Sequence, residues 1–179
     1  MVVRVFAPRR CLVIGCGGAG KTTFSRELGA RTGLPVVHLD RLYWRAGWEP
    51  TPADEWRRTV ADLVGRSAWI MDGNYGGTFD LRLHAADAVY FLDTPRRVCL
   101  ARVLRRWWRY RGSSRPSMAE GCPDRITGSF LHWIWSYRSH RRPEILRRLG
   151  ELGDTRVRIV TSKDDRERAL AEVAAPEAM

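Results

Sequence analysis

The chain has 179 residues, of which 44% are hydrophobic and 28% are charged. These fractions are those of an ordinary globular protein, so they exclude a wholly disordered chain, and no apolar run approaches the ~20 residues of a membrane helix. The formal net charge of +11 is concentrated in residues 96–148, which hold 14 arginines against three acidic residues. A segment this basic favours an anionic partner, either the phosphates of a small ligand or those of a nucleic acid.

The length suits one domain with a proper core and is too short for two independent ones. We therefore predict a single domain over 1–179, with a short lid at roughly 111–125 and a flexible tail at 175–179. The N-terminus shows no signal-peptide pattern, and the four cysteines show no metal-ligand spacing. We expect a cytoplasmic protein in which these cysteines are free thiols.

Short apolar runs alternate with amphipathic stretches, which is typical of βα units that feed a parallel sheet. In chain order the pattern predicts strand 11–14, helix 21–31, strand 35–39, a Trp- and Arg-rich loop 41–50, helix 51–64, strand 68–71, strand 88–92, helix 94–110, a polar loop 112–123, helices 126–139 and 143–149, strand 157–160 and helix 164–174. Five strands with crossover helices predict one three-layer α/β domain.

A glycine-rich turn, GCGGAGKT, joins the first predicted strand to the first helix. Its glycines also fit the dinucleotide fingerprint GxGxxG, and a turn without a ligand is a further alternative, but Lys21 and Thr22 favour the triphosphate-binding loop GxxxxGK[ST]. A triphosphate with Mg²⁺ calls for a cation on the β/γ oxygens and a hydroxyl on the metal. We predict Thr22 as a metal ligand. The predicted ATP-binding residues are Gly15, Gly17, Gly18, Ala19, Gly20, Lys21, Thr22 and Thr23.

Acidic and basic residues elsewhere are placed to act on such a ligand. Asp40 and Asp72 each end a predicted buried strand, and in open α/β sheets ligands bind at that carboxyl edge. Asp40 could orient or deprotonate an acceptor hydroxyl, or form an ion pair with a nearby arginine. Four arginines of the helix 94–110 lie three or four residues apart and share one helix face. This face could bind one polyphosphate, or it could be a basic face exposed to solvent. The four arginines are Arg102, Arg105, Arg106 and Arg109.

Four further segments carry a resemblance to known proteins: HLDRLYW at 38–44, MDGNY at 71–75, RPSMAEGCP at 115–123 and WIW at 133–135. With the glycine-rich turn, they make the chain resemble the small-molecule kinases of the P-loop NTPase fold. It is most similar to the adenylate-kinase-like FlaR-type group of DNA topology modulation proteins. The resemblance implies a five-stranded parallel sheet, a short Arg-rich lid, and ATP·Mg²⁺-dependent phosphoryl transfer to a small metabolite or nucleotide.

The same resemblance implies roles for individual residues. Asp72 matches the Asp of adenylate kinases that holds a Mg²⁺-bound water. Arg102 and Arg106 match their arginines on adenine and phosphate, and Arg115 matches a lid arginine of shikimate-type kinases. The second Asp of the Asp-x-Asp motif of those kinases is replaced by Leu42, which argues against shikimate as the acceptor. The implied catalytic residues are Lys21, Asp40, Arg106 and Arg115. The implied acceptor-binding residues are Asp40, Trp44, Trp48, Asn74, Tyr75 and Arg82.

A second function stays open on the sequence: an ATP-binding regulatory protein that uses residues 96–148 on DNA or another nucleic acid. Arginines interleaved with Trp107 and Trp108 would allow base stacking. However, no helix-turn-helix, zinc-finger or RNP-type signature accompanies them. A kinase needs the same arginines, so the charge does not distinguish the two functions.

Overall fold

The computed structural model describes residues 7–111, 113, 116–152 and 157–173. Five parallel strands form one sheet in the order β2-β5-β1-β6-β7. Their bounds are Arg10–Gly15 (β1), Val36–His38 (β2), Trp69–Asp72 (β5), Ala88–Leu92 (β6) and Val157–Val160 (β7). They coincide with the five predicted strands to within two residues at each end, so the predicted α/β architecture is confirmed.

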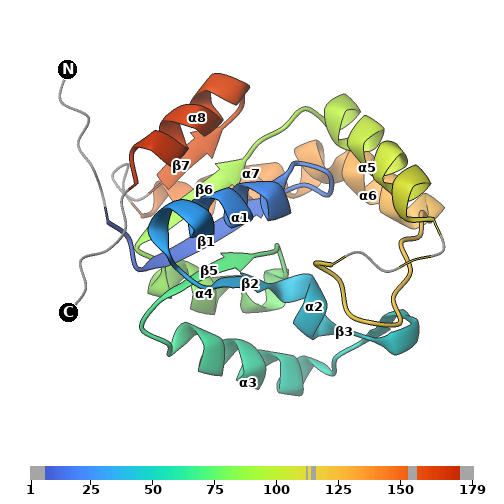
Figure 1. The fold of residues 1–179 in the computed structure, drawn as a ribbon, viewed down its shortest axis with the longest axis horizontal. Helices are drawn as coiled ribbons and strands as arrows, with labels where there is room; N and C mark the ends of the chain where they lie inside the picture. Colours follow the sequence, from blue (N-terminus) through green and yellow to red (C-terminus); the bar gives the residue numbers. More distant parts are fainter. Residues whose placement is uncertain (1–6, 112, 114–115, 153–156, 174–179) are drawn as a thin grey trace.

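Helices cover both faces of the sheet (Figure 1). On one face, α1 and α8 contact each other, while on the other α4 packs on β1 and is covered by α3. After β6, the helices α5, α6 and α7 pack against one another in series. The bounds are Lys21–Thr32 (α1), Ala53–Val64 (α3), Phe79–Ala85 (α4), Arg96–Tyr110 (α5), Gly128–His140 (α6), Arg142–Gly150 (α7) and Lys163–Ala171 (α8).

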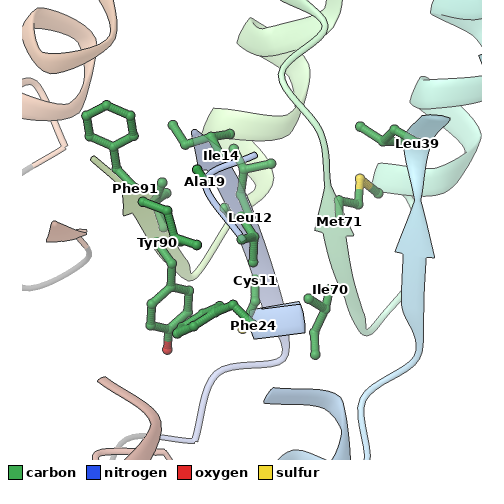
Figure 2. Close-up of a cluster of buried hydrophobic side chains, with 14 of the residues drawn as sticks. Cys11, Leu12, Ile14, Ala19, Phe24, Leu39, Ile70, Met71, Tyr90 and Phe91 are labelled. Carbon is green, nitrogen blue, oxygen red and sulfur yellow. The ribbon is translucent and has the colours of Figure 1, made fainter. Parts of the chain in front are cut away.

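The core is centred on β1 and β6, whose side chains are buried on both faces of the sheet. Because both strands have neighbours on each side and helices above and below, each one is an almost continuous apolar run. Figure 2 shows Phe24 of α1 against Tyr90 of β6, with ring centroids 5.1 Å apart. This packing fixes the start of α1, and with it the glycine-rich turn, against the sheet.

The segment 41–50 was predicted to be a loop, and this was wrong. It contains α2 (Leu39–Tyr43), β3 (Trp44–Arg45), the short helix η1 (Ala46–Trp48) and β4 (Glu49–Pro50). The strands β3 and β4 pair in an antiparallel hairpin. Elements of two to five residues are too short to show a hydrophobic period, and these are stabilised by packing against other parts of the chain.

The prediction also missed the helix α4, and the short helix η2 (Gly76–Thr78) before it. The two consecutive glycines at 76 and 77 suppress any helical signal there, because glycine is a poor helix former. The seven residues of α4 become helical by burying Phe79, Arg82 and Leu83. Helix formation here depends on tertiary packing rather than on local propensity.

All four cysteines are buried and free, as expected. Among the residues that the structure describes, no helix is long and apolar enough to span a bilayer. The predicted tail at 175–179 lies outside that part of the chain.

The start of α8 is held by a capping box. The Ser162 hydroxyl accepts a hydrogen bond from the Asp165 amide at 3.0 Å, and the Asp165 carboxylate accepts from the Ser162 amide at 3.1 Å. The Thr161 hydroxyl also donates to this carboxylate, at 2.6 Å. This contact is the largest of the effects that lower the pKa of Asp165 to about 2, followed by the amide of Thr161 and then by the hydroxyl and amide of Ser162.

We therefore expect Asp165 to make the stability of the protein depend on pH. A carboxyl whose pKa is lower in the folded state stabilises that state above its unfolded pKa of about 4, and this contribution disappears as the pH falls towards 2. Wild type and Asp165→Asn should therefore differ most at pH 5 and converge by pH 2, when their unfolding free energies are measured by urea denaturation. A constant difference across this range would contradict the assignment.

Candidate functional site

A cleft of about 1370 Å³ opens at the carboxyl edge of the sheet. It is lined by the glycine-rich turn, by Asp40 of α2, by the end of β5, by one face of α5, and by a segment that follows α5. Ligands of open α/β sheets bind at this edge, near the point where the order of the strands reverses. Most of the predicted donor and acceptor residues thereby line one cleft, although they come from segments that are far apart in the chain.

The glycine-rich turn has the conformation that an anion-binding loop requires. Gly18 and Gly20 have φ of +81° and +100°, which favour glycine, and Gly20 caps the N-terminus of α1. The amides of such a turn and the helix dipole together attract phosphate. The Lys21 ammonium donates to the carbonyls of Gly15 at 2.9 Å and Cys16 at 3.1 Å, so it lies over the loop.

The turn packs closely on the beginning of α5. A Cβ added to Gly18 would lie 2.4 Å from the Cys99 carbonyl oxygen. A Cβ on Gly17 would lie 2.9 Å from the Phe130 ring of α6. Gly18 is therefore required both by close approach to backbone and by its own backbone conformation, whereas a larger residue at Gly17 would displace only the Phe130 ring.

We expect Gly18→Ala to lower both stability and nucleotide affinity. An alanine with this φ costs roughly 1–2 kcal/mol, and the clash with Cys99 backbone adds to it. Gly33→Ala is the matched control, because Gly33 has φ of +72° and no atom within 4 Å of an added Cβ. Thermal unfolding and Mg·ADP titration should show a larger loss of stability for Gly18→Ala and a loss of affinity for Gly18→Ala alone. Equal losses of stability in the two variants would contradict the packing argument.

Asp72 ends β5 as predicted, whereas Asp40 lies in the first turn of α2 rather than at the end of β2, because that strand stops at His38. Both carboxylates line the cleft, and each has a partner from another segment. Asp72 is 5% exposed and its carboxylate is 3.0 Å from the Nδ1 of His38, which stands beside it in the register of β2 and β5. The Tyr75 hydroxyl donates to Asp40 at 2.6 Å. Burial, and then the charge of Asp40, raise the pKa of Tyr75 above its ordinary value, so this hydroxyl keeps its proton and stays a donor.

Residues that follow Asp72 in the chain connect the two halves of the site. The Asn74 side chain donates to the Gly15 carbonyl at 2.8 Å and accepts from the Gly15 amide at 3.1 Å. Asn74 and Tyr75 line the cleft, as an acceptor site would require. Arg82 does not: it is fully buried, and its guanidinium donates to backbone carbonyls. Its placement differs from the one expected for a residue that contacts an acceptor.

The predicted arginines have distinct surroundings. Arg102 is exposed and donates to the Ala19 carbonyl at 3.1 Å, so it lies beside the glycine-rich turn. Arg106 forms an ion pair with the buried carboxylate of Asp124 at 3.0 Å, so in this structure the phosphate role predicted for it is not observed. Arg105 and Arg109 are exposed and also line the cleft. Arg115 lies outside the described residues.

The segment 116–125, which we call the cover segment, is docked on the β3–β4 hairpin. In Figure 1 this segment passes beside β3 before the chain enters α6. The Gly47 amide donates to the Gly121 carbonyl and the Trp48 indole to the Pro123 carbonyl, at 3.0 and 3.1 Å. Trp44 and Trp48 pack against its buried residues. These residues are Met118, Ala119 and Cys122.

The predicted lid at 111–125 is therefore joined to the hairpin over the residues described, and the two tryptophans have a packing role beside their place in the cleft wall. Sequence reasoning left His38 unassigned, although it stands in the HLD motif next to Asp40. It also left out Arg125 and Thr94, which line the cleft. Only the tertiary contact with Asp72 marks His38, since a single histidine carries no local signal.

The donor set at the cleft fits a magnesium ion held together with phosphates. Mg²⁺ bound to nucleotides takes one or two protein oxygens, with phosphates and waters as the other ligands. The Thr22 hydroxyl and the Asp72 carboxylate both line the cleft beside Lys21. No cluster of three or more His, Cys, Asp or Glu that could hold a metal by itself occurs in the described part of the chain. Thr22 and Asp72 fit a nucleotide-bound Mg²⁺.

Several solved kinases have a similar fold. A gluconokinase from Sinorhizobium meliloti 1021 matches with a TM-score of 0.58 and 20% identity, over 92% of this chain and 91% of that one. The shikimate kinase from Acinetobacter baumannii matches with a TM-score of 0.58 and 17% identity, over 91% of this chain and 89% of that one. The shikimate kinase from Bacteroides thetaiotaomicron matches with a TM-score of 0.54 and 16% identity, over 92% of this chain and 96% of that one.

No protein-family model and no curated protein sequence matches the chain. At these identities the structural similarity shows the fold, which is that of the P-loop kinases, and does not extend to a substrate. The narrower resemblance to the FlaR-type topology modulation group gains no support from these comparisons.

Proposed function

We propose that this protein transfers the γ-phosphoryl group of ATP to a small metabolite or nucleotide, with Mg²⁺ as cofactor. The observation that supports this most strongly is that the glycine-rich turn with Lys21 and the carboxylates of Asp40 and Asp72 line one cleft. Phosphoryl transfer needs reactants held in position and positive charge near the moving group, more than covalent chemistry from the protein. The cleft offers both.

On the donor side, the amides of the turn and the N-terminus of α1 bind the phosphates. Lys21, which lies over the loop on its carbonyls, exchanges these contacts for the β/γ oxygens. Thr22 and Asp72 would hold Mg²⁺, which neutralises negative charge on the phosphates when bound. Arg102 adds a positive charge beside the turn, and Arg115 stays a proposed lid residue.

On the acceptor side, Asp40 orients the acceptor hydroxyl and takes its proton as the new oxygen–phosphorus bond forms and the bond to the ADP oxygen breaks. The hydrogen bond from Tyr75 fixes the orientation of this carboxylate. Trp44 and Trp48 offer aromatic surface for a planar or sugar-like acceptor.

The cover segment contributes by restricting the access of water. An open site would let water take the phosphoryl group and hydrolyse ATP. The cover segment is attached to α5 through the Arg106–Asp124 pair and to the hairpin through Trp48. It therefore shields the cleft between these two elements.

The experiment is transfer of label from γ-labelled ATP·Mg²⁺ into a pooled extract of metabolites and nucleotides. We expect one new labelled small molecule, whose identification gives the acceptor. If ATP binds but label appears only in phosphate through slow hydrolysis, the proposed function is wrong. Residues 96–148 would then be tested on nucleic acid, where a duplex footprint predicts affinity that falls steeply with salt.

A further inference from the structure

Arg82 is a buried cation whose hydrogen bonds converge on one turn of the backbone. It is 0% exposed, and its nitrogens donate to the Gly73 carbonyl at 2.8 Å, the Tyr75 carbonyl at 2.8 Å, the Thr78 carbonyl at 3.2 Å and the carbonyl of Asn74. Burial lowers the pKa of Arg82 to about 10, which leaves it charged at neutral pH. A buried charge is costly, and an apolar side chain would fill the same space without that cost.

The turn that Arg82 holds has an unusual conformation. Gly73 has φ of +150°, and Tyr75, which is not a glycine, has φ of +34°. A bulky L-residue rarely takes a positive φ, and such residues persist where their surroundings over-determine them. The hydrogen bonds from the Arg82 guanidinium to four carbonyls stabilise this conformation, because its N–H groups form a rigid planar fork.

The same turn carries one side chain to each half of the cleft. Asn74 makes both of its bonds to Gly15, the first glycine of the donor loop, 59 residues earlier in the chain. Tyr75 donates to Asp40 on the acceptor side. Through Asn74 and Tyr75, Arg82 therefore positions both the loop that would carry the phosphates and the carboxylate that would face the acceptor.

We propose that Arg82 is a positioning residue that couples the donor loop to the acceptor carboxylate by fixing the Gly73–Tyr75 turn. The inference rests on the proposed function for its catalytic meaning, but the mechanical link is a property of the protein without ligand. It assigns to Arg82 an indirect role in place of the direct contact with the acceptor that its position in the chain suggested.

The test compares Arg82→Lys, Asn74→Ala and the double variant. Lysine keeps the charge but cannot reach four carbonyls at once. In the unliganded protein, we expect exchange of the Gly15 amide, followed by NMR, to accelerate about tenfold in Arg82→Lys. Mg·ADP affinity should fall about tenfold in each single variant and by no more than that in the double variant, because both remove the same link.

Controls separate positioning from loss of stability. Arg158→Lys, on the exposed edge strand β7, should leave the Gly15 amide and Mg·ADP affinity unchanged. Where Arg82→Lys does not fold, Arg82→Gln, which retains two N–H donors, replaces it. A lower melting temperature with unchanged exchange at Gly15, or effects on affinity that multiply in the double variant, would overturn the inference.

The link from Arg82 through Tyr75 to Asp40 on the acceptor side is tested with Tyr75→Phe. Label transfer should fall in Arg82→Lys by more than its loss of Mg·ADP affinity, and Tyr75→Phe added to Arg82→Lys should lower transfer little further. Transfer that falls only in proportion to Mg·ADP affinity would overturn this arm. If wild type transfers no label, the proposed function fails. Exchange at Gly15 and Mg·ADP affinity then still decide whether Arg82 holds the donor loop.

Discussion

Lys21→Ala is expected to lower transfer of the γ-phosphoryl group from ATP by about 10²–10³-fold, the effect of removing one electrostatic contact to a transition state. Lys21 is one of only two lysines in the chain, and its ammonium lies over the donor loop on the carbonyls of Gly15 and Cys16. An alanine removes the only side-chain cation of the loop itself. The measurement is label transfer into the pooled extract, with Mg·ADP affinity determined in parallel.

The control for this variant removes a positive charge elsewhere. Arg58→Ala deletes an exposed arginine of α3, which is not part of the cleft wall. It should leave transfer within about twofold of wild type, since long-range surface charges are screened by salt. Retention of full transfer by Lys21→Ala would refute the assignment of the glycine-rich turn as the donor site, even if the fold stays intact.

Asp40→Asn is expected to abolish most of the transfer while leaving nucleotide affinity within about threefold of wild type. General base catalysis contributes typically 10²–10⁴-fold, and an amide cannot take the proton of the acceptor hydroxyl. Asn is nearly isosteric and can still accept the hydrogen bond of Tyr75, so the fold should be preserved. Comparison of transfer rates with Mg·ADP affinities separates the two halves of the cleft.

A companion variant, Tyr75→Phe, measures how much the hydrogen bond to Asp40 contributes to transfer. It keeps the aromatic ring, which packs against Tyr43 and Trp56 with centroids 4.6 and 5.1 Å away, and removes only the hydroxyl. We expect a loss of about tenfold in transfer, the size of one hydrogen bond to a charged group. If Asp40→Asn instead weakens nucleotide binding and spares transfer, Asp40 belongs to the donor side and the proposed role is wrong.

The local motifs were predictable because their chemistry depends on residues adjacent in the chain. The phosphate-binding turn needs glycines at fixed offsets and a lysine after them, between a buried strand and a helix, and 15–22 meets all these conditions. The strand-end position of Asp72, and the place of Asp40 just beyond β2, followed from the apolar runs before them. Parallel strands share one carboxyl edge, so their convergence on one cleft could be expected.

The details of the acceptor side were beyond such reasoning. Nothing in the residues 41–50 indicates that they form a hairpin, or that its Gly47 pairs with Gly121 in the segment after α5. The partner of Arg106 is likewise decided by the approach of Asp124, since an arginine on a basic helix face has no sequence signal for its counter-ion. These contacts join segments that only the packing of the whole chain brings together.

By itself, the sequence determined the α/β class, the five strands, the donor loop and the carboxylates at the edge of the sheet, because hydrophobic periodicity and turn chemistry act over a few neighbouring residues. Only the tertiary structure decided that Asn74 holds Gly15 and that His38 meets Asp72. It also decided that Arg82 lies behind the cleft rather than in it, because α4 forms by burying that side chain. Hydrogen bonds between residues that are distant in sequence depend on the three-dimensional approach of whole elements, which no local pattern records.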